Sequence, residues 1–215
     1  MMESKTLISG FWRIIPMNNK LDDLALKYGT DKVNHGYTKH YFNMFEHLCQ
    51  KELNILEIGV YKGASLRMWA DFFPHSQIYG IDDGSSGDLC RIYDNPRIHF
   101  REGHQANNQF LTSLGNEVKK FDMIFDDGSH YSSDIIHTFQ FMFGPYLTDG
   151  GYYVIEDLQC SYPPYTSLGL SARFNSKGQT AVEYIKKLND SIHTNPNTPI
   201  ESIFVYPQMT FIKKK

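Results

Sequence analysis

The sequence predicts an α/β protein with one seven-stranded, mostly parallel sheet and helices on both faces. Apolar, strand-like runs alternate with helical stretches along most of the chain, a pattern typical of right-handed βαβ units. The last two apolar runs are separated only by Pro207 and Gln208, which is too short for a parallel crossover. These two runs are therefore expected to pair as an antiparallel hairpin at the end of the sheet.

The expected elements follow from hydrophobic periodicity and from glycines at helix ends. The expected strands are Asn54–Val60, Gln77–Asp82, Arg97–Phe100, a run beginning at Phe121, a run beginning at Tyr152, Ser202–Tyr206 and Met209–Lys213. The expected helices are Leu21–Tyr28, Thr38–Gln50, Ser65–Phe73, Asn107–Val118, Ser132–Leu147 and Thr180–His193. Gly29 directly follows the first helix and is expected to end it.

The chain is expected to form one domain with an arm before it. A length of 215 residues suits a single domain that buries roughly 70% of its unfolded surface. Residues 1–20 are interpreted as an irregular arm, and residues 21–215 as the domain. The stretch 159–179 is rich in Tyr, Pro, Ser and Gly and follows an acidic strand end, so it is predicted to be a lid or substrate loop.

Composition excludes several classes of protein. A net charge of −3 argues against a dedicated nucleic-acid binder, which needs a basic face. The three cysteines form no CxxC pair, which favours reduced thiols in a cytoplasmic protein over disulfides or a zinc site. No apolar stretch reaches the roughly 18 residues that a membrane-spanning helix needs, so no membrane partner is expected.

The turn after the first strand of the sheet has features of a cofactor site. Gly59 and Gly63 lie where this strand passes into a helix, and glycine lets the backbone approach a ligand closely. Asp82 ends the next strand, where an acidic side chain can accept hydrogen bonds from the hydroxyls of a ribose. The G-x-x-x-G spacing differs from that of dinucleotide folds and favours S-adenosylmethionine over a nicotinamide cofactor. A plain tight turn and a capping Asp are the alternative interpretations.

Two neighbouring strands are expected to end in acidic residues. Asp126 and Asp127 end the strand that begins at Phe121, and Glu156 and Asp157 end the strand that begins at Tyr152. Carboxyl ends of parallel strands meet at one edge of a sheet, so these carboxylates are expected to form a site for a hard cation such as Mg²⁺. His130 follows Asp127 by three residues and is a candidate general base. Helix capping by the acids and a structural role for the histidine are the alternatives.

Five segments of the chain form a recognisable set: Tyr28–Lys32 (YGTDK), His35–Thr38 (HGYT), Leu56–Trp69 (LEIGVYKGASLRMW), Asp126–His130 (DDGSH) and Val154–Leu158 (VIEDL). Together they resemble a family, the magnesium- and S-adenosylmethionine-dependent sugar O-methyltransferases of natural-product pathways. The resemblance covers roughly residues 24–190. It implies a Rossmann-like class I methyltransferase fold, whose sheet also ends in an antiparallel hairpin.

The resemblance also implies roles for individual residues. Metal ligands would be Asp127, Glu156 and Asp157, and the general base would be His130. S-adenosylmethionine would be held by Gly59, Gly63 and Asp82, with Gln105 and Asp126 nearby. The chain departs from the family at Gly103-His104-Gln105, where the family usually has Gly-Asp-Gln. A contact between position 104 and the adenine is therefore not carried over.

The predicted function is Mg²⁺-assisted methylation of a hydroxyl on a sugar or a glycosylated small molecule, with S-adenosylmethionine as the donor. Relatives in this family are often oligomers, which leaves a homo-oligomer open, although the sequence does not define the oligomeric state. The alternatives are a methyltransferase-fold protein of the cephalosporin-hydroxylase type and a non-catalytic cofactor-binding module. A nicotinamide oxidoreductase is a further alternative, disfavoured by the glycine spacing and the terminal hairpin.

Overall fold

The computed structural model describes residues 6–8, 11–13, 19–85, 94–164 and 178–215. The strands of the main sheet are β3 (Asn54–Ile58), β4 (Gln77–Asp82), β5 (Ile98–Glu102), β6 (Phe121–Asp126), β7 (Leu147–Ile155), β8 (Ile200–Tyr206) and β9 (Met209–Lys214). The helices are α1 (Lys20–Tyr28), α2 (Tyr37–Phe45), α3 (Ala64–Phe72), α4 (Asn108–Val118), α5 (Ser132–Met142) and α6 (Ala181–Thr194). Three short 3-10 helices are η1 (Asp31–Val33), η2 (Glu46–Leu48) and η3 (Leu158–Ser161).

The main sheet has the strand order β5-β4-β3-β6-β7-β9-β8. Neighbouring strands from β5 to β7 pair in parallel, whereas β9 pairs antiparallel with both β7 and β8. The predicted fold class is confirmed, including the antiparallel hairpin at the end of the chain. Gln208 lies in the tight turn of that hairpin and has a positive φ of 66°.

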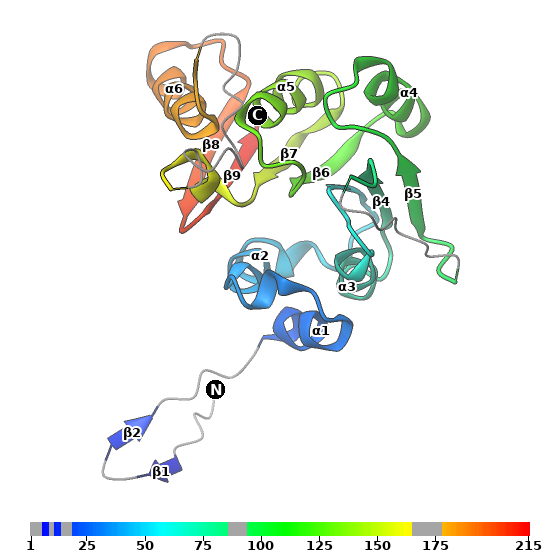
Figure 1. Cartoon of the computed structure of the whole chain (residues 1–215), viewed down its shortest axis with the longest axis vertical. Helices are drawn as coiled ribbons and strands as arrows, with labels where there is room; N and C mark the ends of the chain where they lie inside the picture. The colour runs from blue at the N-terminus through cyan, green and yellow to red at the C-terminus, as the bar shows by residue number, and fades with distance from the viewer. Residues whose placement is uncertain (1–5, 9–10, 14–18, 86–93, 165–177) are drawn as a thin grey trace.

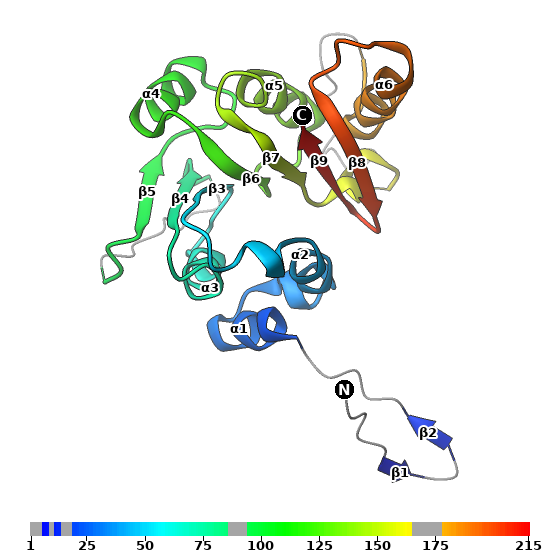
Figure 2. The ribbon, with the colours of Figure 1, turned by 180° about the vertical axis from the view of Figure 1, so that it is seen from behind.

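Helices cover both faces of the sheet, so the molecule has three layers (Figures 1 and 2). One face carries α1, α2 and α3, and the other carries α4, α5 and α6. Successive residues of a strand point to opposite faces, so each strand serves two cores. In β6, for example, Phe125 packs into the core beneath α2 and α3, while Ile124 packs into the core beneath α4 and α5.

The strand order reverses direction at β3, which has β4 on one side and β6 on the other. The chain connections after β3 and β6 therefore leave the sheet on opposite faces. In an open α/β sheet this switch point creates a crevice beyond the carboxyl ends of the strands. The fold thus places the ends of β3, β4 and β6 around one hollow.

The structure differs from the sequence-based expectation in the arm and at the ends of several elements, among them α2, which ends at Phe45 instead of Gln50. Residues of the predicted arm form a two-stranded antiparallel sheet, β1 (Thr6–Ile8) with β2 (Phe11–Arg13). Helix α5 ends at Met142, and β7 begins at Leu147 instead of Tyr152. Residues 165–177 of the predicted lid lie outside the described residues, so the lid and the proposed domain division stay predictions. No described helix combines the length and the apolar character needed to cross a bilayer.

Candidate active site at the carboxyl ends of the strands

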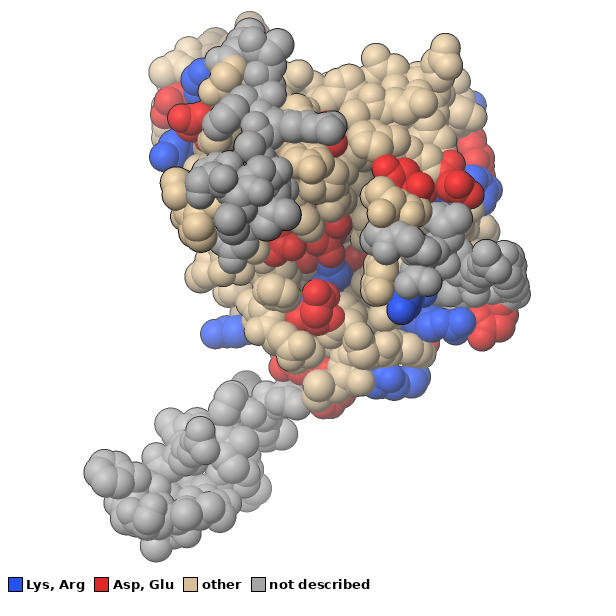
Figure 3. All heavy atoms as spheres, in the orientation of Figure 1, with Lys and Arg blue, Asp and Glu red and all other residues tan. Residues whose placement is uncertain are grey.

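The ends of β3, β4, β5 and β6 open into a crevice with a cavity volume of about 490 Å³. Figure 3 shows acidic side chains with a basic one among them in a hollow at the centre of this face. Of the predicted site residues, those that line the crevice are Gly59, Asp82, Gln105, Asp127, His130 and Asp157. Gly63, Asp126 and Glu156 do not belong to its lining.

Gly59 is required by the close approach of two strand ends. Its φ is +80°, and a Cβ at this position would lie 2.1 Å from the backbone oxygen of Asp127. The backbone of the turn is held by Asp82, whose Oδ2 accepts hydrogen bonds from the amides of Val60 and Tyr61. Gly63, also with a positive φ, is the N-cap residue of α3. The predicted cofactor residues are therefore also the residues that shape this turn.

Gln105 and Asp126 form a buried pair behind the crevice. Gln105 Nε2 donates to Asp126 Oδ1 at 3.1 Å, and Gln105 Oε1 accepts from the Ser129 amide at 2.7 Å. The hydroxyl of Tyr153 donates to the other oxygen of Asp126. Burial raises the pKa of Asp126 to about 6, although these hydrogen bonds oppose the shift. Asp126 thus supports Gln105 and the loop after β6, while Gln105 itself faces the cavity.

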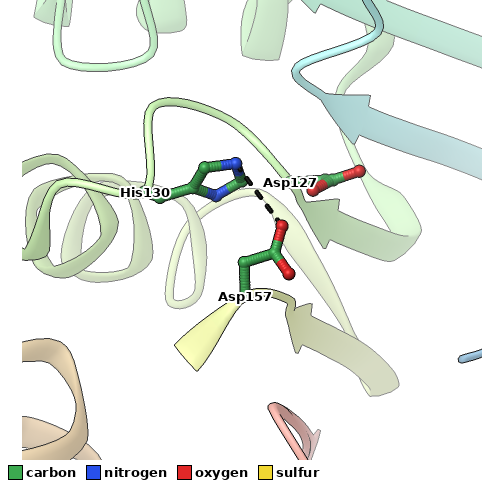
Figure 4. Close-up of side chains that lie close together, drawn as sticks. All are labelled: Asp127, His130 and Asp157. Carbon is green, nitrogen blue, oxygen red and sulfur yellow. Dashed lines mark ion pairs between the residues drawn. The ribbon is translucent and has the colours of Figure 1, made fainter. Parts of the chain in front are cut away.

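Asp127, His130 and Asp157 converge at the mouth of the crevice (Figure 4). One potential ligand atom from each lies within 4.8 Å of the others. His130 Nε2 is 3.5 Å from Asp157 Oδ2. Asp157 also accepts hydrogen bonds on Oδ1 from the hydroxyl of Tyr37 and from Gln159 Nε2, at 2.7 and 2.8 Å. Burial acts to raise the pKa of Asp157, but these two donors and the nearby histidine hold it below its usual value.

Two of these residues have an unfavourable backbone conformation. His130 has a φ of 57° and Asp157 a φ of 53°, in the left-handed region that non-glycine residues rarely adopt. Such conformations cost on the order of 1–3 kcal/mol each and tend to occur at functional sites. Here they turn both side chains toward the same point at the ends of β6 and β7.

Lys32 fills the inner end of the acidic group. Its ammonium lies 2.6 Å from Asp127 Oδ2, 2.8 Å from Glu156 Oε1 and 3.3 Å from Glu57 Oε1, and its side chain is only 2% exposed. Burial alone would lower the pKa of Lys32, but the three carboxylates raise it well above its usual value. Lys32 therefore remains charged and neutralises part of the buried negative charge.

Glu156 faces Lys32 and not the group of Asp127, His130 and Asp157. Both of its oxygens accept hydrogen bonds from the lysine, and Tyr41 donates to one of them. Burial raises the pKa of Glu156 to about 8, with a further contribution from the charge of Asp127. The role of Glu156 as a metal ligand stays a prediction, because the structure gives it a different partner.

The donor set at the crevice mouth fits a hard divalent cation. Mg²⁺ takes oxygen ligands and usually keeps several waters, so two carboxylates are enough to hold it. Asp127 and Asp157 offer these oxygens, and both side chains are partly exposed, at 22% and 18%. His130 lies beside them with its imidazole accessible from the crevice.

Sequence reasoning assigned no role to three residues that hold the acidic group in place. These are Lys32, Tyr37 and Gln159, which contact Asp127 or Asp157 directly. Lys32 belongs to the YGTDK segment that supports the family resemblance, and this segment was the sequence signal that could have pointed to a role for Lys32. Its partner Asp127 is 95 residues away in the chain, so spacing alone gave no indication of the contact.

Fold and site define the class of protein, a domain with the class I methyltransferase fold. Residues 56–158 match the family described as a methyltransferase domain. A structure of a putative caffeoyl-CoA O-methyltransferase from Staphylococcus aureus, 17% identical with a TM-score of 0.54, is similar in fold. The structural match covers 92% of this chain and 93% of the chain in that structure.

The predicted resemblance to sugar O-methyltransferases is also confirmed. The chain is 32% identical to the 8-demethyl-8-alpha-L-rhamnosyl tetracenomycin-C 2'-O-methyltransferase of Streptomyces olivaceus, over 91% of this chain and 54% of the relative. It is 37% identical to the L-olivosyl-oleandolide 3-O-methyltransferase of Streptomyces antibioticus, over 80% of this chain and 46% of the relative. The structure of the MycE methyltransferase in complex with Mg, SAH and mycinamycin VI matches with a TM-score of 0.78 and 33% identity. The match covers 92% of this chain and 55% of the MycE chain.

This chain is therefore a homologue of the sugar O-methyltransferases. It spans about half the length of the curated relatives that it matches.

Proposed function

We propose that the chain carries the catalytic domain of an S-adenosylmethionine-dependent, Mg²⁺-assisted O-methyltransferase. Its acceptor is a hydroxyl of a sugar or of a glycosylated small molecule. The observation that carries this proposal is the convergence of Asp127, His130 and Asp157 at the mouth of the crevice. The homology to sugar O-methyltransferases supports the choice of reaction and acceptor class.

His130 is proposed as the general base. Its imidazole takes the proton of the acceptor hydroxyl, and Asp157, 3.5 Å from Nε2, stabilises the imidazolium that forms. The hydroxyl oxygen then bonds to the methyl carbon as the bond from that carbon to the sulfonium sulfur breaks. When bound at Asp127 and Asp157, Mg²⁺ supplies a Lewis acid that lowers the pKa of the acceptor hydroxyl.

The crevice next to this group is proposed as the cofactor site. The backbone of Gly59 and the side chain of Gln105 line it, and Asp82 holds the backbone of the turn. Asp83 follows Asp82, is partly exposed at 32% and also lines the crevice. Asp83 is a second candidate to accept hydrogen bonds from the ribose hydroxyls of the cofactor. His104 Nε2 lies 3.8 Å from Asp83 Oδ2 and also lines the cavity.

Calorimetric titration of the metal-stripped protein tests the proposal. S-adenosylmethionine is expected to bind, with NAD as the control that does not. Addition of Mg²⁺ then allows sugars and glycosides to be screened for methyl transfer. If S-adenosylmethionine fails to bind with and without Mg²⁺, the protein is not a methyltransferase and the non-catalytic module becomes the better interpretation.

His130→Ala tests the proposed base once an acceptor is found. Loss of a general base is expected to lower kcat by roughly 10²–10⁴-fold, with little change in affinity for S-adenosylmethionine. His137→Ala is the matched control, because His137 lies on the exposed side of α5 and contacts Asn108. An unchanged kcat in His130→Ala excludes His130 from proton transfer.

The alternative of a cephalosporin-hydroxylase-type protein is not favoured. The curated relatives, at 31–37% identity, are all named O-methyltransferases. The absence of nucleic-acid and membrane partners, a homo-oligomeric state and a cytoplasmic location stay predictions.

A further inference from the structure

The connection after β5 places a histidine in the crevice beside the end of β4. Strands β4 and β5 pair in parallel with Asp82 opposite Glu102, so the residues that follow them leave the sheet side by side. The amide of Gly103 donates to the carbonyl oxygen of Asp82 at 2.9 Å, which ties the two strand ends together. His104 then lines the crevice next to Asp83.

The two ring nitrogens of His104 have different roles. Nδ1 accepts a hydrogen bond from the backbone amide of Ala106 at 3.0 Å, so it carries no hydrogen. A neutral imidazole has a single N–H group, and the hydrogen-bond network therefore assigns that hydrogen to Nε2. Nε2 is thus a hydrogen-bond donor.

This donor makes no hydrogen bond to any described residue. Two carboxylate oxygens lie near Nε2, Asp83 Oδ2 at 3.8 Å and Asp134 Oδ2 at 3.9 Å, and both are too far for a hydrogen bond. Asp134 Oδ2 accepts instead from the hydroxyl of Ser129 at 2.8 Å. Because the side chain of His104 is 44% exposed, a ligand in the crevice can reach this donor. A ligand that displaces solvent from Nε2 must supply an acceptor in its place.

The position of His104 points to the purine of the cofactor. Asp82 and Asp83 are the proposed contacts of the ribose hydroxyls, and the purine is attached directly to that ribose. The edge of adenine carries ring nitrogens that accept hydrogen bonds and a 6-amino group that donates them. An N–H donor such as Nε2 can bind the ring nitrogens but not the amino group.

We propose that His104 recognises a hydrogen-bond acceptor on the edge of the cofactor's purine and does not recognise its 6-amino group. The inference rests on the proposed function and concerns the specificity of the same crevice. It distinguishes this chain from the family that it resembles, which usually has Asp at position 104. A carboxylate accepts hydrogen bonds and does not donate them, so the histidine reverses the direction of the hydrogen bond at this position.

Calorimetric titration with S-adenosylhomocysteine and with S-inosylhomocysteine tests the proposal. The inosyl compound has a carbonyl oxygen in place of the 6-amino group and keeps N3 and N7 as acceptors. The wild type is expected to bind the two compounds within about threefold of each other, since either purine supplies an acceptor. His104→Asp is expected to bind the adenosyl compound at least about tenfold more tightly, because its carboxylate has no donor to meet in the inosyl compound.

His75→Asp is the matched control, because it makes the same change in an exposed turn between α3 and β4 that does not line the crevice. It is expected to keep the ratio of affinities found in the wild type. Thermal unfolding of both variants checks that each is folded. Nitrogen-15 NMR of the histidine side chains in the complex with S-adenosylhomocysteine gives a readout that needs no variant. A hydrogen on Nε2 of His104 supports the assignment, and a hydrogen on Nδ1 alone overturns it.

The affinities also separate this inference from the proposed function. A wild type that prefers the adenosyl compound by more than about threefold overturns the role of His104, although the cofactor site itself is then supported. The same ratio of affinities in His104→Asp as in His75→Asp also overturns that role. If neither compound binds the wild type, both the inference and the proposed methyl transfer are wrong.

Discussion

Lys32 brings a positive charge into a place where three carboxylates would otherwise repel one another. Glu57, Asp127 and Glu156 all contact its ammonium, and two of these acids are almost completely buried. Buried carboxylates without a counter-charge are strongly unfavourable. Lys32 therefore stabilises the acidic group from within and leaves Asp127 and Asp157 to face the crevice.

Lys32→Met is expected to lower the free energy of unfolding by about 3–5 kcal/mol, because it leaves buried carboxylates unpaired. Urea-induced unfolding at pH 7 measures the change. Lys27→Met is the matched control, since Lys27 pairs with Asp71 at the exposed surface and is 57% exposed. Its loss is expected to have only a small effect. A Lys32 variant as stable as the Lys27 variant would show that the acids do not depend on this charge.

Asp126 predicts a specific dependence of stability on pH. Burial raises its pKa from 3.8 to about 6, so between these values the folded protein binds a proton that the unfolded chain has released. The free energy of unfolding therefore falls as pH rises through this window, by about 3 kcal/mol from this residue alone. Asp126→Asn removes the titration, so its stability is expected to fall less than that of the wild type between pH 4 and 6. Identical slopes in the two proteins would contradict the assignment.

How far the sequence predicts the site depends on the range of the contacts. Asp127, His130 and Asp157 were predicted to lie close together, because each follows a strand end and parallel strand ends share an edge. Glu156 was placed with them, but its carboxylate points toward Lys32 in the connection between α1 and α2. That contact joins residues 124 positions apart, and no local pattern encodes it.

At the scale of elements, the sequence predicted every strand of the main sheet and each α-helix. Two of the wrong boundaries lie where proline or glycine intervenes. The predicted helix Ser132–Leu147 ends at Met142, because Pro145 lacks an amide proton and its ring disfavours a helical preceding residue. Strand β7 begins at Leu147, although Gly150 and Gly151 are poor strand formers, because Leu147 pairs with Phe121 of β6.

The turn between β3 and α3 has little tolerance for side chains. Gly59→Ala is expected to lower the free energy of unfolding by at least about 2 kcal/mol, because its φ is positive and its Cβ would meet the backbone of Asp127 and Gly128. Gly144→Ala is the control, with a φ outside the left-handed region and no atom within 4 Å of the added carbon. Thermal unfolding distinguishes the two. If both alanines are tolerated equally, the close approach of the strand ends does not constrain this turn.

At the scale of the whole molecule, a cation between β6 and β7 is expected to stabilise the fold. Asp127 and Asp157 end these two strands, and both carboxylates lie within reach of one ion. A ligand that binds only the folded state stabilises it by about 2.7 kcal/mol at 100 times its Kd. For a domain of this size, such a gain corresponds to a rise in Tm of roughly 5–10 °C.

Calorimetry in EDTA and in saturating Mg²⁺, at matched ionic strength, measures this rise. Asp157→Asn is expected to remove most of it, because one of the two charged ligands is lost while the amide keeps the size of the side chain. Asp23→Asn, at an exposed position in the first turn of α1, is expected to keep the full effect of Mg²⁺. If Mg²⁺ stabilises Asp157→Asn as much as the wild type, the cation binds elsewhere. The proposed acceptor site would then also lie elsewhere.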